Sequence, residues 1–410
     1  MAEKQQLAIG LDTGSRWTRC IICAVEGDVA RYLGHGQAAA AGWAKGRLAD
    51  PAALAESIHE AVKQAEDRAG VQAEWVTAGV GGPSIQGANS RGVYEFGRPR
   101  TIDHDDLAYA VQLASKVRLE DDRLLLHVWP QDFTIDGRAG YQKPRNAVGS
   151  RLEANVHVIT GSHQDHQCLV AAIHQAHLAV EETVYEPVAA AYACVSPEDR
   201  KKGVAVLDIG LHSADLVIYD GDSMLLATSL PVWADHLTRD VAWVLKVSYD
   251  DSECLKTEYG CAMLGLTADN SLIEAPSAEG RPSREARRRE LNEILEARAE
   301  ELFLYLKAEL TRVGMEQHLL EGLVLTGGGS LLNGMCDMAE RVLNCQARNG
   351  LPEGIYKWPE ELADPQWTTV AGLAMYSGRL KAGPASGPGA RRRHGGGGGR
   401  PRGLMSLVMR

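Results

Sequence analysis

The chain has 410 residues, a formal net charge of −11 and 45% hydrophobic residues, which allows two to four domains with cores of their own. No run of 18 apolar residues occurs, so the sequence excludes a transmembrane helix. The first six residues lack the apolar stretch of a signal peptide, and a cytoplasmic protein is therefore expected.

The predicted elements alternate between strands and helices along the chain. Residues 1–83 are predicted to form strands around one helix, and residues 84–162 an inserted unit with strands at Leu124–Thr134 and Leu152–Thr160. The predicted helices are Pro51–Ala69, a helix capped by Asp103 that ends near Val117, 164–180, a helix that starts at Tyr185-Glu186-Pro187, and Ser283–Val313.

The distribution of charge along the chain limits the kinds of binding partner. From Arg379 onward the chain carries eight Lys and Arg and no Asp or Glu, so the body is more acidic than the net charge suggests. An acidic body argues against nucleic acid as a partner, and a basic tail favours an anionic surface.

The close pair Cys20 and Cys23 is expected on opposite faces of one strand, as buried free thiols.

Three short turns contain the glycines and aspartates that indicate a function. They are Gly10–Ser15, Leu207–Asp215 and Leu325–Ser330, roughly 195 and 120 residues apart. Apolar β-like runs flank the first two, which predicts hairpins with Asp12 and Asp208 at their tips. Glycines let backbone N–H groups approach phosphate oxygens, and aspartates hold Mg²⁺ through water. The turns therefore predict a cage for ATP, and the alternative is three unrelated β-turns.

This arrangement resembles the actin-like ATPase superfamily. Further runs, at Leu124–Asp136, Ala154–Thr160, Glu258–Ala262, Gly280–Pro282 and Gly322–Ser330, resemble one family within it, the FtsA family of cell division proteins. The resemblance covers Leu7 to Leu380. It implies an α/β actin-like fold of two similar halves around an ATP cleft, with an inserted α/β subdomain of the FtsA (SHS2) type and a disordered tail.

The resemblance also implies a division of the chain into subdomains. These are 1–83 with 163–200 and 355–380 for the first half, 84–162 for the insert, 201–230 with 300–354 for the second half, 231–299 for its outer subdomain, 381–401 for a flexible linker and 402–410 for an amphipathic membrane-targeting segment.

Site residues follow from the same resemblance. Asp12 and Asp208 are expected to hold Mg²⁺ through water, and both belong with Glu186 to the candidate catalytic set. The residues expected to contact phosphate are Thr13, Gly14, Ser15, Gly210 and Ser213, and those expected to close over the adenosine are Gly327, Gly328, Gly329 and Ser330. Glu253 and Lys256 share a helix face and are expected to contact ribose and base; an ordinary surface ion pair is the alternative.

Glu186 is the candidate for orienting the water that attacks the γ-phosphate, with a simple helix-start carboxylate as the alternative. The second phosphate turn departs from the family pattern, because Leu211 and His212 stand where relatives have glycines. Both residues resist positive φ, although His212 could donate to the γ-phosphate. ATP binding with slow or negligible turnover is therefore expected.

The tail completes the functional hypothesis. Leu404, Met405, Leu407 and Val408 can line one face of a short helix beside arginines, which favours an anionic membrane surface. The resemblance implies a protein that binds ATP, forms actin-like filaments, holds the C-terminal peptide of FtsZ near Pro231–Val313 and tethers the FtsZ ring to the cytoplasmic face of the membrane, where it recruits later division proteins.

Two alternatives share the fold. A pilus-assembly adaptor of the PilM type would not need the tail, and a small-molecule kinase would need a substrate-cleft aspartate that residues 84–162 do not supply. A P-loop is excluded because no GxxxxGK[ST] motif occurs.

Overall fold

The structure, a computed structural model, describes residues 6–27, 29–44, 46–221, 223–268, 271–276 and 283–381. The predictions for the linker after Lys381 and for 402–410, with Leu404, Met405, Leu407 and Val408, lie outside these residues. Within the described residues, no helix is both long and apolar enough to cross a membrane.

The helices and strands alternate as predicted. The α-helices are α1 (Pro51–Ala69), α2 (His104–Ala114), α3 (His163–Gln175), α4 (Glu186–Cys194), α5 (Pro197–Lys201), α6 (Ala234–Leu245), α7 (Tyr249–Tyr259), α8 (Arg288–Arg312), α9 (Met335–Leu343) and α10 (Thr368–Lys381). The longer strands are β1 (Leu7–Thr13), β2 (Trp17–Glu26), β3 (Val29–Ala39), β6 (Trp75–Val80), β7 (Gln86–Thr101), β8 (Arg123–Ile135), β10 (Val148–Ser162), β11 (Ala179–Tyr185), β12 (Val204–Ile209), β13 (Ala214–Asp220) and β14 (Ser223–Leu230). The short strands are β4 (Trp43–Ala44), β5 (Arg47–Leu48), β9 (Arg138–Tyr141), β15 (Leu272–Ala275), β16 (Arg284–Arg287), β17 (Leu323–Thr326), β18 (Ala347–Asn349) and β19 (Ile355–Tyr356).

Two sheets repeat one pattern, which confirms the actin-like fold of two similar halves. The first has the order β11-β6-β1-β2-β3-β19, and the second begins β18-β17-β12-β13-β14. In each sheet an antiparallel meander (β1-β2-β3 or β12-β13-β14) has a parallel strand beside its first member, β6 or β17. The tips of the β1–β2 and β12–β13 hairpins therefore hold equivalent places in the two halves.

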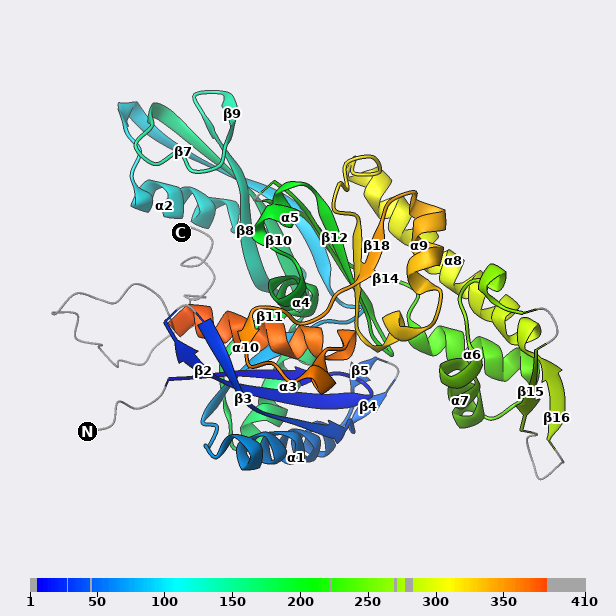
Figure 1. Cartoon of the computed structure of the whole chain (residues 1–410). Helices are drawn as coiled ribbons and strands as arrows, with labels where there is room; N and C mark the ends of the chain where they lie inside the picture. The colour runs from blue at the N-terminus through cyan, green and yellow to red at the C-terminus, as the bar shows by residue number, and fades with distance from the viewer. Residues whose placement is uncertain are drawn as a thin grey trace.

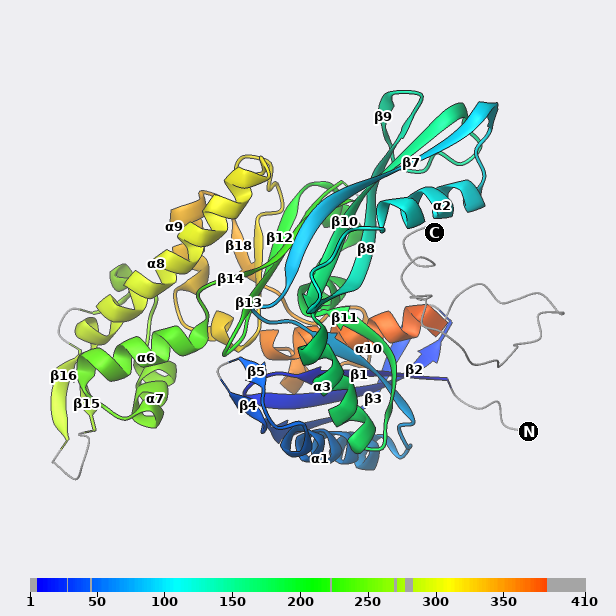
Figure 2. The ribbon, with the colours of Figure 1, turned by 180° about the vertical axis from the view of Figure 1, so that it is seen from behind.

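The central layer of the molecule is a pair of helices, α4 and α10. Helix α10 packs on β1 and β2 of the first sheet, and α4 contacts β12 and β13 of the second (Figure 1). Helix α1 covers the opposite face of the first sheet, and α8 and α9 pack against the outer side of the second sheet (Figure 2). Both α4 and α10 begin at the cleft between the halves.

The inserted residues extend the second sheet. Strands β7, β10, β8 and β9 continue the order after β14, through the pairing of Gln86 with Thr228, and project away from the rest of the molecule (Figure 1). Helix α2 packs on β7 and β10 and closes a separate core around Ile102, Leu107 and Phe133. A further core lies between α6, α7, α8 and the β15–β16 hairpin.

The structure confirms the helix Pro51–Ala69, the Asp103 cap and the helix start at Glu186. Cys20 and Cys23 are buried in different cores on opposite faces of β2, as expected.

Three predicted helices are too long. The helix capped by Asp103 ends at Ala114 instead of near Val117. The helix predicted over 164–180 ends at Gln175, because His177 takes a left-handed φ of 62° and leads into β11. The helix predicted from Ser283 starts at Arg288, because Arg284–Arg287 pair with β15 and bury Ala286 against Ile273.

Candidate functional site

A cavity of about 430 Å³ lies in the cleft between the two halves. Its wall contains the tips of both hairpins, the glycine turn after β17, the start of α4 and the face of α7 that carries Glu253 and Lys256. The three turns that the sequence predicts to act together therefore meet at one cavity.

The first turn connects β1 to β2. Thr13 pairs with Thr18, so Gly14, Ser15, Arg16 and Trp17 form the tip that lines the cavity. Gly10 lies lower in the same strand, where a Cβ atom would be 2.4 Å from the carbonyl oxygen of Val370. That glycine allows α10 to approach the strand that carries Asp12.

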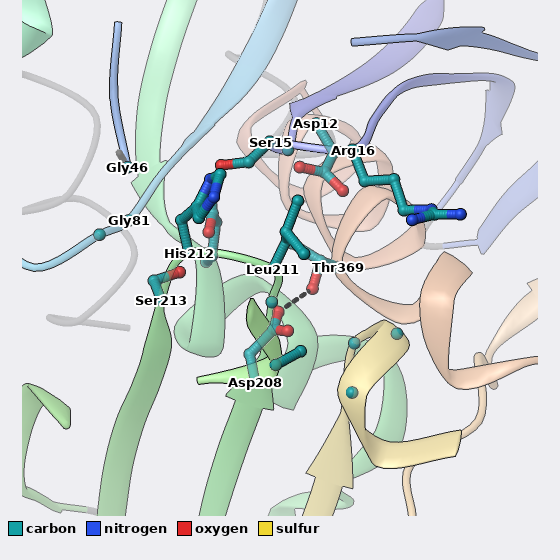
Figure 3. Close-up of a pocket in the computed structure, with 18 of the residues that line it drawn as sticks. Asp12, Ser15, Arg16, Gly46, Gly81, Asp208, Leu211, His212, Ser213 and Thr369 are labelled. Carbon is teal, nitrogen blue, oxygen red and sulfur yellow. Dashed lines mark hydrogen bonds between the residues drawn. The ribbon is translucent and has the colours of Figure 1, made fainter. Parts of the chain in front are cut away.

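The second turn connects β12 to β13 without backbone strain. The Gly210 N–H donates to the Ser213 carbonyl at 2.8 Å, and neither Leu211 nor His212 has a positive φ. The concern that these two residues strain the turn is therefore wrong. Burial lowers the pKa of His212, so its imidazole is neutral near pH 7. Ser15 and His212 point toward the same part of the cavity (Figure 3).

The third turn follows β17 and lies against the second. Gly327 has a φ of 77°, and a Cβ atom there would be 2.2 Å from Oδ1 of Asp208, so only glycine allows this approach. Gly327, Gly328 and Gly329 line the cavity, but Ser330 does not. Its buried hydroxyl donates to the Gly327 carbonyl at 2.7 Å and stabilises the turn. The expected contact between Ser330 and the adenosine is therefore not supported.

Four carboxyl groups gather beneath the turns. Asp12, Asp208 and Asp215 are buried, and Glu186 at the start of α4 lines the cavity. Thr369, at the start of α10, donates its hydroxyl to Oδ2 of Asp208 at 2.5 Å (Figure 3). Oδ2 of Asp215 accepts the Gly82 N–H at 3.0 Å.

Burial and mutual repulsion raise the pKa values of these groups. Burial raises the pKa of Asp12 to about 7, the Arg19 charge opposes this rise, and the Asp208 charge adds to it. Burial likewise raises the pKa of Asp208 and brings that of Asp215 to about 6. The pKa of Glu186 is raised well above its usual range by burial and by Asp12, Asp215 and Asp208. The site therefore holds more negative charge than it can solvate, and it favours a cation.

The Asp215 carboxyl predicts a pH dependence of stability. Its pKa is about 6 in the folded state against 3.8 for an ordinary Asp, so the folded state binds more protons between these values. Stability therefore falls as pH rises from about 4 to about 6 and stays low above, where the buried charge of Asp215 costs about 3 kcal/mol. Asp215→Asn removes that cost and can still accept from Gly82, so thermal unfolding of the nucleotide-free protein at pH 8 should shift upward by several degrees.

Asp220→Asn is the matched control for this measurement, because Asp220 is exposed at the end of the same strand. It should leave the transition unchanged. A melting temperature of Asp215→Asn at or below that of the unaltered protein at pH 8 would contradict the expected cost of the buried charge.

Glu253 and Lys256 do not form a surface ion pair. Lys256 is 7% exposed and lies 2.7 Å from Glu253, and both bond to Thr238. Glu253 also lies 3.4 Å from the Arg16 guanidinium, which links α7 to the first turn across the cleft. The pair lines the cavity, so the surface alternative is excluded and the ribose contact stays a prediction.

Several cavity residues have no counterpart in the sequence predictions. Gly81 and Gly82 follow β6, and a Cβ atom at Gly81 would be 2.3 Å from Oε2 of Glu186 and 2.9 Å from Oδ2 of Asp215. The Gly-Gly-Pro run after an apolar strand is a signal that could have indicated this turn. Arg19 and Thr369 are placed in the cavity wall by strand register and by α10, and short patterns do not reveal them.

Two family models match the chain. The model "Cell division protein FtsA" matches residues 205–372, and the model "SHS2 domain inserted in FTSA" matches residues 82–160. The cell division protein FtsA of Borreliella burgdorferi is 34% identical over 375 residues, which cover 91% of each chain. That of Escherichia coli K12 is 29% identical over 92% of this chain and 91% of its own.

Solved structures share the fold at lower identity. The PilM–PilN type IV pilus biogenesis complex matches with a TM-score of 0.65 at 18% identity, over 90% of this chain and 98% of that one. MreB5 of Spiroplasma citri bound to ADP matches with a TM-score of 0.55 at 12% identity, over 92% and 97% of the chains. A second structure of that protein, bound to AMPPNP, has a TM-score of 0.54 over 92% of this chain and 98% of that one, at 12% identity. These likenesses establish the actin-like architecture.

Proposed function

The chain belongs to the FtsA family of cell division proteins, and from this premise we propose that it binds ATP, assembles into actin-like filaments and tethers the FtsZ ring to the cytoplasmic face of the membrane. The proposal of nucleotide binding rests on one observation. The turns Gly10–Ser15, Leu207–Asp215 and Leu325–Ser330 all contribute residues to the wall of one cavity. Because the relatives place the chain in the FtsA family, no observation favours the two alternatives, a pilus-assembly adaptor and a small-molecule kinase.

In this proposal the two hairpin tips hold the phosphates. The candidate donors are the N–H groups and hydroxyls of Thr13, Gly14, Ser15 and Ser213, with the imidazole of His212 and the N–H of Gly210 beside them. Gly327, Gly328 and Gly329 close over the adenosine, and Glu253 with Lys256 contacts the ribose and base. ADP and AMPPNP bound to MreB5, a protein of the same fold, support the choice of nucleotide.

A magnesium ion fits the acidic floor of the cavity. Asp12 and Asp208 are buried carboxylates that repel each other, and Mg²⁺ prefers oxygen ligands and keeps several waters. Among the described residues, no three His, Cys, Asp or Glu side chains are arranged to hold a metal ion, so phosphate and water oxygens would complete the coordination. Bound there, the ion would offset the charge of the phosphates.

Glu186 is proposed to orient water beside the terminal phosphate. Its carboxyl group lines the cavity, and its raised pKa, caused by burial and the neighbouring carboxylates, makes it a stronger proton acceptor. Turnover is expected to be slow, because the side chains of Leu211 and His212 crowd a backbone that glycines leave open to phosphate in relatives.

The tether depends on the basic, partly apolar end of the chain. Four apolar side chains and the neighbouring arginines give weak binding of one copy to anionic lipid, and many copies in a filament bind firmly through avidity. The proposed landing site for the acidic FtsZ peptide is the outer subdomain, where Arg284 and Arg287 are exposed. The insert, proposed as 84–162, would contact neighbouring subunits and later division proteins.

Sedimentation with vesicles tests the tether. The full chain, with ATP and FtsZ, should carry FtsZ into the pellet with vesicles that contain anionic lipid and leave it in the supernatant with neutral vesicles. A chain that ends at Lys381 should not sediment FtsZ, and Leu407→Asp, which keeps the arginines but breaks the apolar face, should bind at least tenfold less.

Two outcomes count against the tether. One is sedimentation of FtsZ by the shortened chain as well as by the full chain. The other is binding of the full chain to vesicles without any recruitment of FtsZ, which would leave a membrane protein with a different partner.

A further inference from the structure

Strand β11 connects the insert, which consists of β7 to β10 with α2, to the candidate catalytic carboxyl. It is an edge strand of the first sheet, and its last residue, Tyr185, directly precedes Glu186 at the start of α4. An edge strand has N–H groups that its own sheet does not bond, and a buried N–H group needs a partner. The partner of the Tyr185 N–H lies in the insert, where Nε2 of His127 on β8 accepts it at 2.9 Å.

The buried His127 imidazole is suited to this contact. The residue is 1% exposed, and burial, followed by the nearby His166, lowers its pKa to about 3. The ring is therefore neutral near pH 7, and because Nε2 accepts the Tyr185 N–H, the single ring proton is on Nδ1. A protonated ring has no free lone pair and would lose this bond.

The Tyr185 side chain bonds to the second half at the place where the insert joins it. Its hydroxyl donates to the carbonyl of Thr228 at 2.8 Å, and Thr228 pairs with Gln86, the first residue of β7. The main chain of Tyr185 pairs with Val80 of β6 in the first half. This one buried residue is therefore bonded to the insert and to both halves.

The Glu186 side chain has little room to move. A Cβ atom at Gly79 would be 3.0 Å from Cγ of Glu186, and one at Gly81 would be 2.3 Å from its Oε2, so both glycines make space for the carboxyl group. That group lines the cavity beside the turn after β6. Its position therefore depends on where the main chain at Tyr185 places the start of α4.

We propose that His127 is a positioning residue for hydrolysis: through the Tyr185 N–H, the insert sets the position of the Glu186 carboxyl beside the terminal phosphate. This rests on the proposed hydrolytic role of Glu186 and gives the insert a part in the reaction. His127 does not line the cavity, so its effect passes through Tyr185. A displacement of about 1 Å at a reacting group can cost about a hundredfold in rate.

Single-turnover hydrolysis tests this role, with the full chain in excess over labelled ATP so that a slow rate can be measured. His127→Leu removes the acceptor and should lower the rate constant at least about tenfold, while the affinity for ATP stays within about threefold. His127→Gln places an amide oxygen near the position of Nε2 and should keep the rate within about threefold of that of the unaltered chain. His127→Asn has the same amide one bond shorter and should lose rate as His127→Leu does.

His157→Leu is the matched control for the loss of a buried imidazole. His157 lies on β10 of the insert and is 2% exposed, and its Nε2 accepts the main-chain N–H of Ala227 in the second half at 3.0 Å. This contact does not lead to Glu186. The variant should therefore lower the melting temperature about as much as His127→Leu and leave the rate constant within about threefold of that of the unaltered chain.

Four outcomes overturn the proposal. An equal loss of rate in His127→Leu and His157→Leu would assign the loss to general destabilisation, and an unchanged rate in His127→Leu would mean that its contact does not position Glu186. A loss of rate in His127→Gln as large as in His127→Asn would mean that the acceptor is not what matters. An unaltered chain that binds ATP without hydrolysing it would remove the role of Glu186, and with it this proposal. Failure of that chain to bind ATP is a different result, because it would remove the nucleotide site itself.

Discussion

Gly372→Ala should lower the free energy of unfolding by about 3 kcal/mol and weaken nucleotide binding. A Cβ atom at Gly372 of α10 would be 1.8 Å from the carbonyl oxygen of Ala189 in α4, where backbone meets backbone and no side chain can move aside. The two helices must separate. Each helix has a cavity-lining residue in its first turn, Glu186 in α4 and Thr369 in α10, so their displacement should reach the site. Chemical unfolding and nucleotide titration measure the two effects.

Gly378 of the same helix provides the matched control. Its nearest neighbours to an added Cβ atom are the side chains of Ala8 and Val25, at 3.6 and 3.8 Å, which is ordinary van der Waals contact. Gly378→Ala should therefore raise stability by up to about 1 kcal/mol through helix propensity. If Gly372→Ala were as stable as Gly378→Ala, the close approach of α4 and α10 would be refuted.

Glu253→Ala should cost about 3 kcal/mol, because it leaves the buried ammonium of Lys256 without its carboxylate. Thr238 remains as a neutral partner of Lys256 and cannot balance the charge. Lys256→Met should cost less, since it removes the buried charge and keeps an unbranched side chain. Chemical unfolding of the nucleotide-free variants measures both.

The same variant tests the ribose contact of Glu253. If the carboxylate binds a ribose hydroxyl, the unaltered chain should prefer ATP to 2′-deoxyATP or 3′-deoxyATP, and Glu253→Ala should lose that preference. Glu258→Ala, on the exposed face of the same helix, should change neither stability nor preference. An unchanged preference in a destabilised Glu253→Ala would assign the pair a purely structural role.

Local sequence patterns were sufficient to predict the elements whose deciding contacts lie within a few residues of one another. Asp103 caps the helix that follows it, and Glu186-Pro187 starts α4, because caps and proline act within one turn of the chain. The two aspartate hairpins were predicted for the same reason, since a strand, a tight turn and a strand are neighbours in sequence. The order and spacing of the three turns indicated the actin-like superfamily, and runs such as Leu124–Asp136 indicated the FtsA family, which the relatives confirm.

The sequence predictions differ from the structure where a contact that local patterns do not specify decides the conformation. Arg284–Arg287 have a helical pattern, yet they form β16 because β15 offers a partner. The hydroxyl of Ser330 donates to the Gly327 carbonyl, a contact that the sequence did not indicate, and the adenosine contact of Ser330 stays a prediction. Leu211 and His212 occupy glycine positions without strain, because the turn at Gly210 closes on the Ser213 carbonyl with ordinary φ values.

Local sequence specifies the turns, the caps and the repeated order of strands, because each depends on residues within a few positions of one another. The tertiary structure alone decided which charges meet. Asp12 and Arg19 share a sheet face through register, Thr369 reaches Asp208 from 161 positions away, and Gly372 admits the backbone of α4. Contacts of this kind arise from the packing of two halves on the α4–α10 pair, and no local pattern specifies that packing.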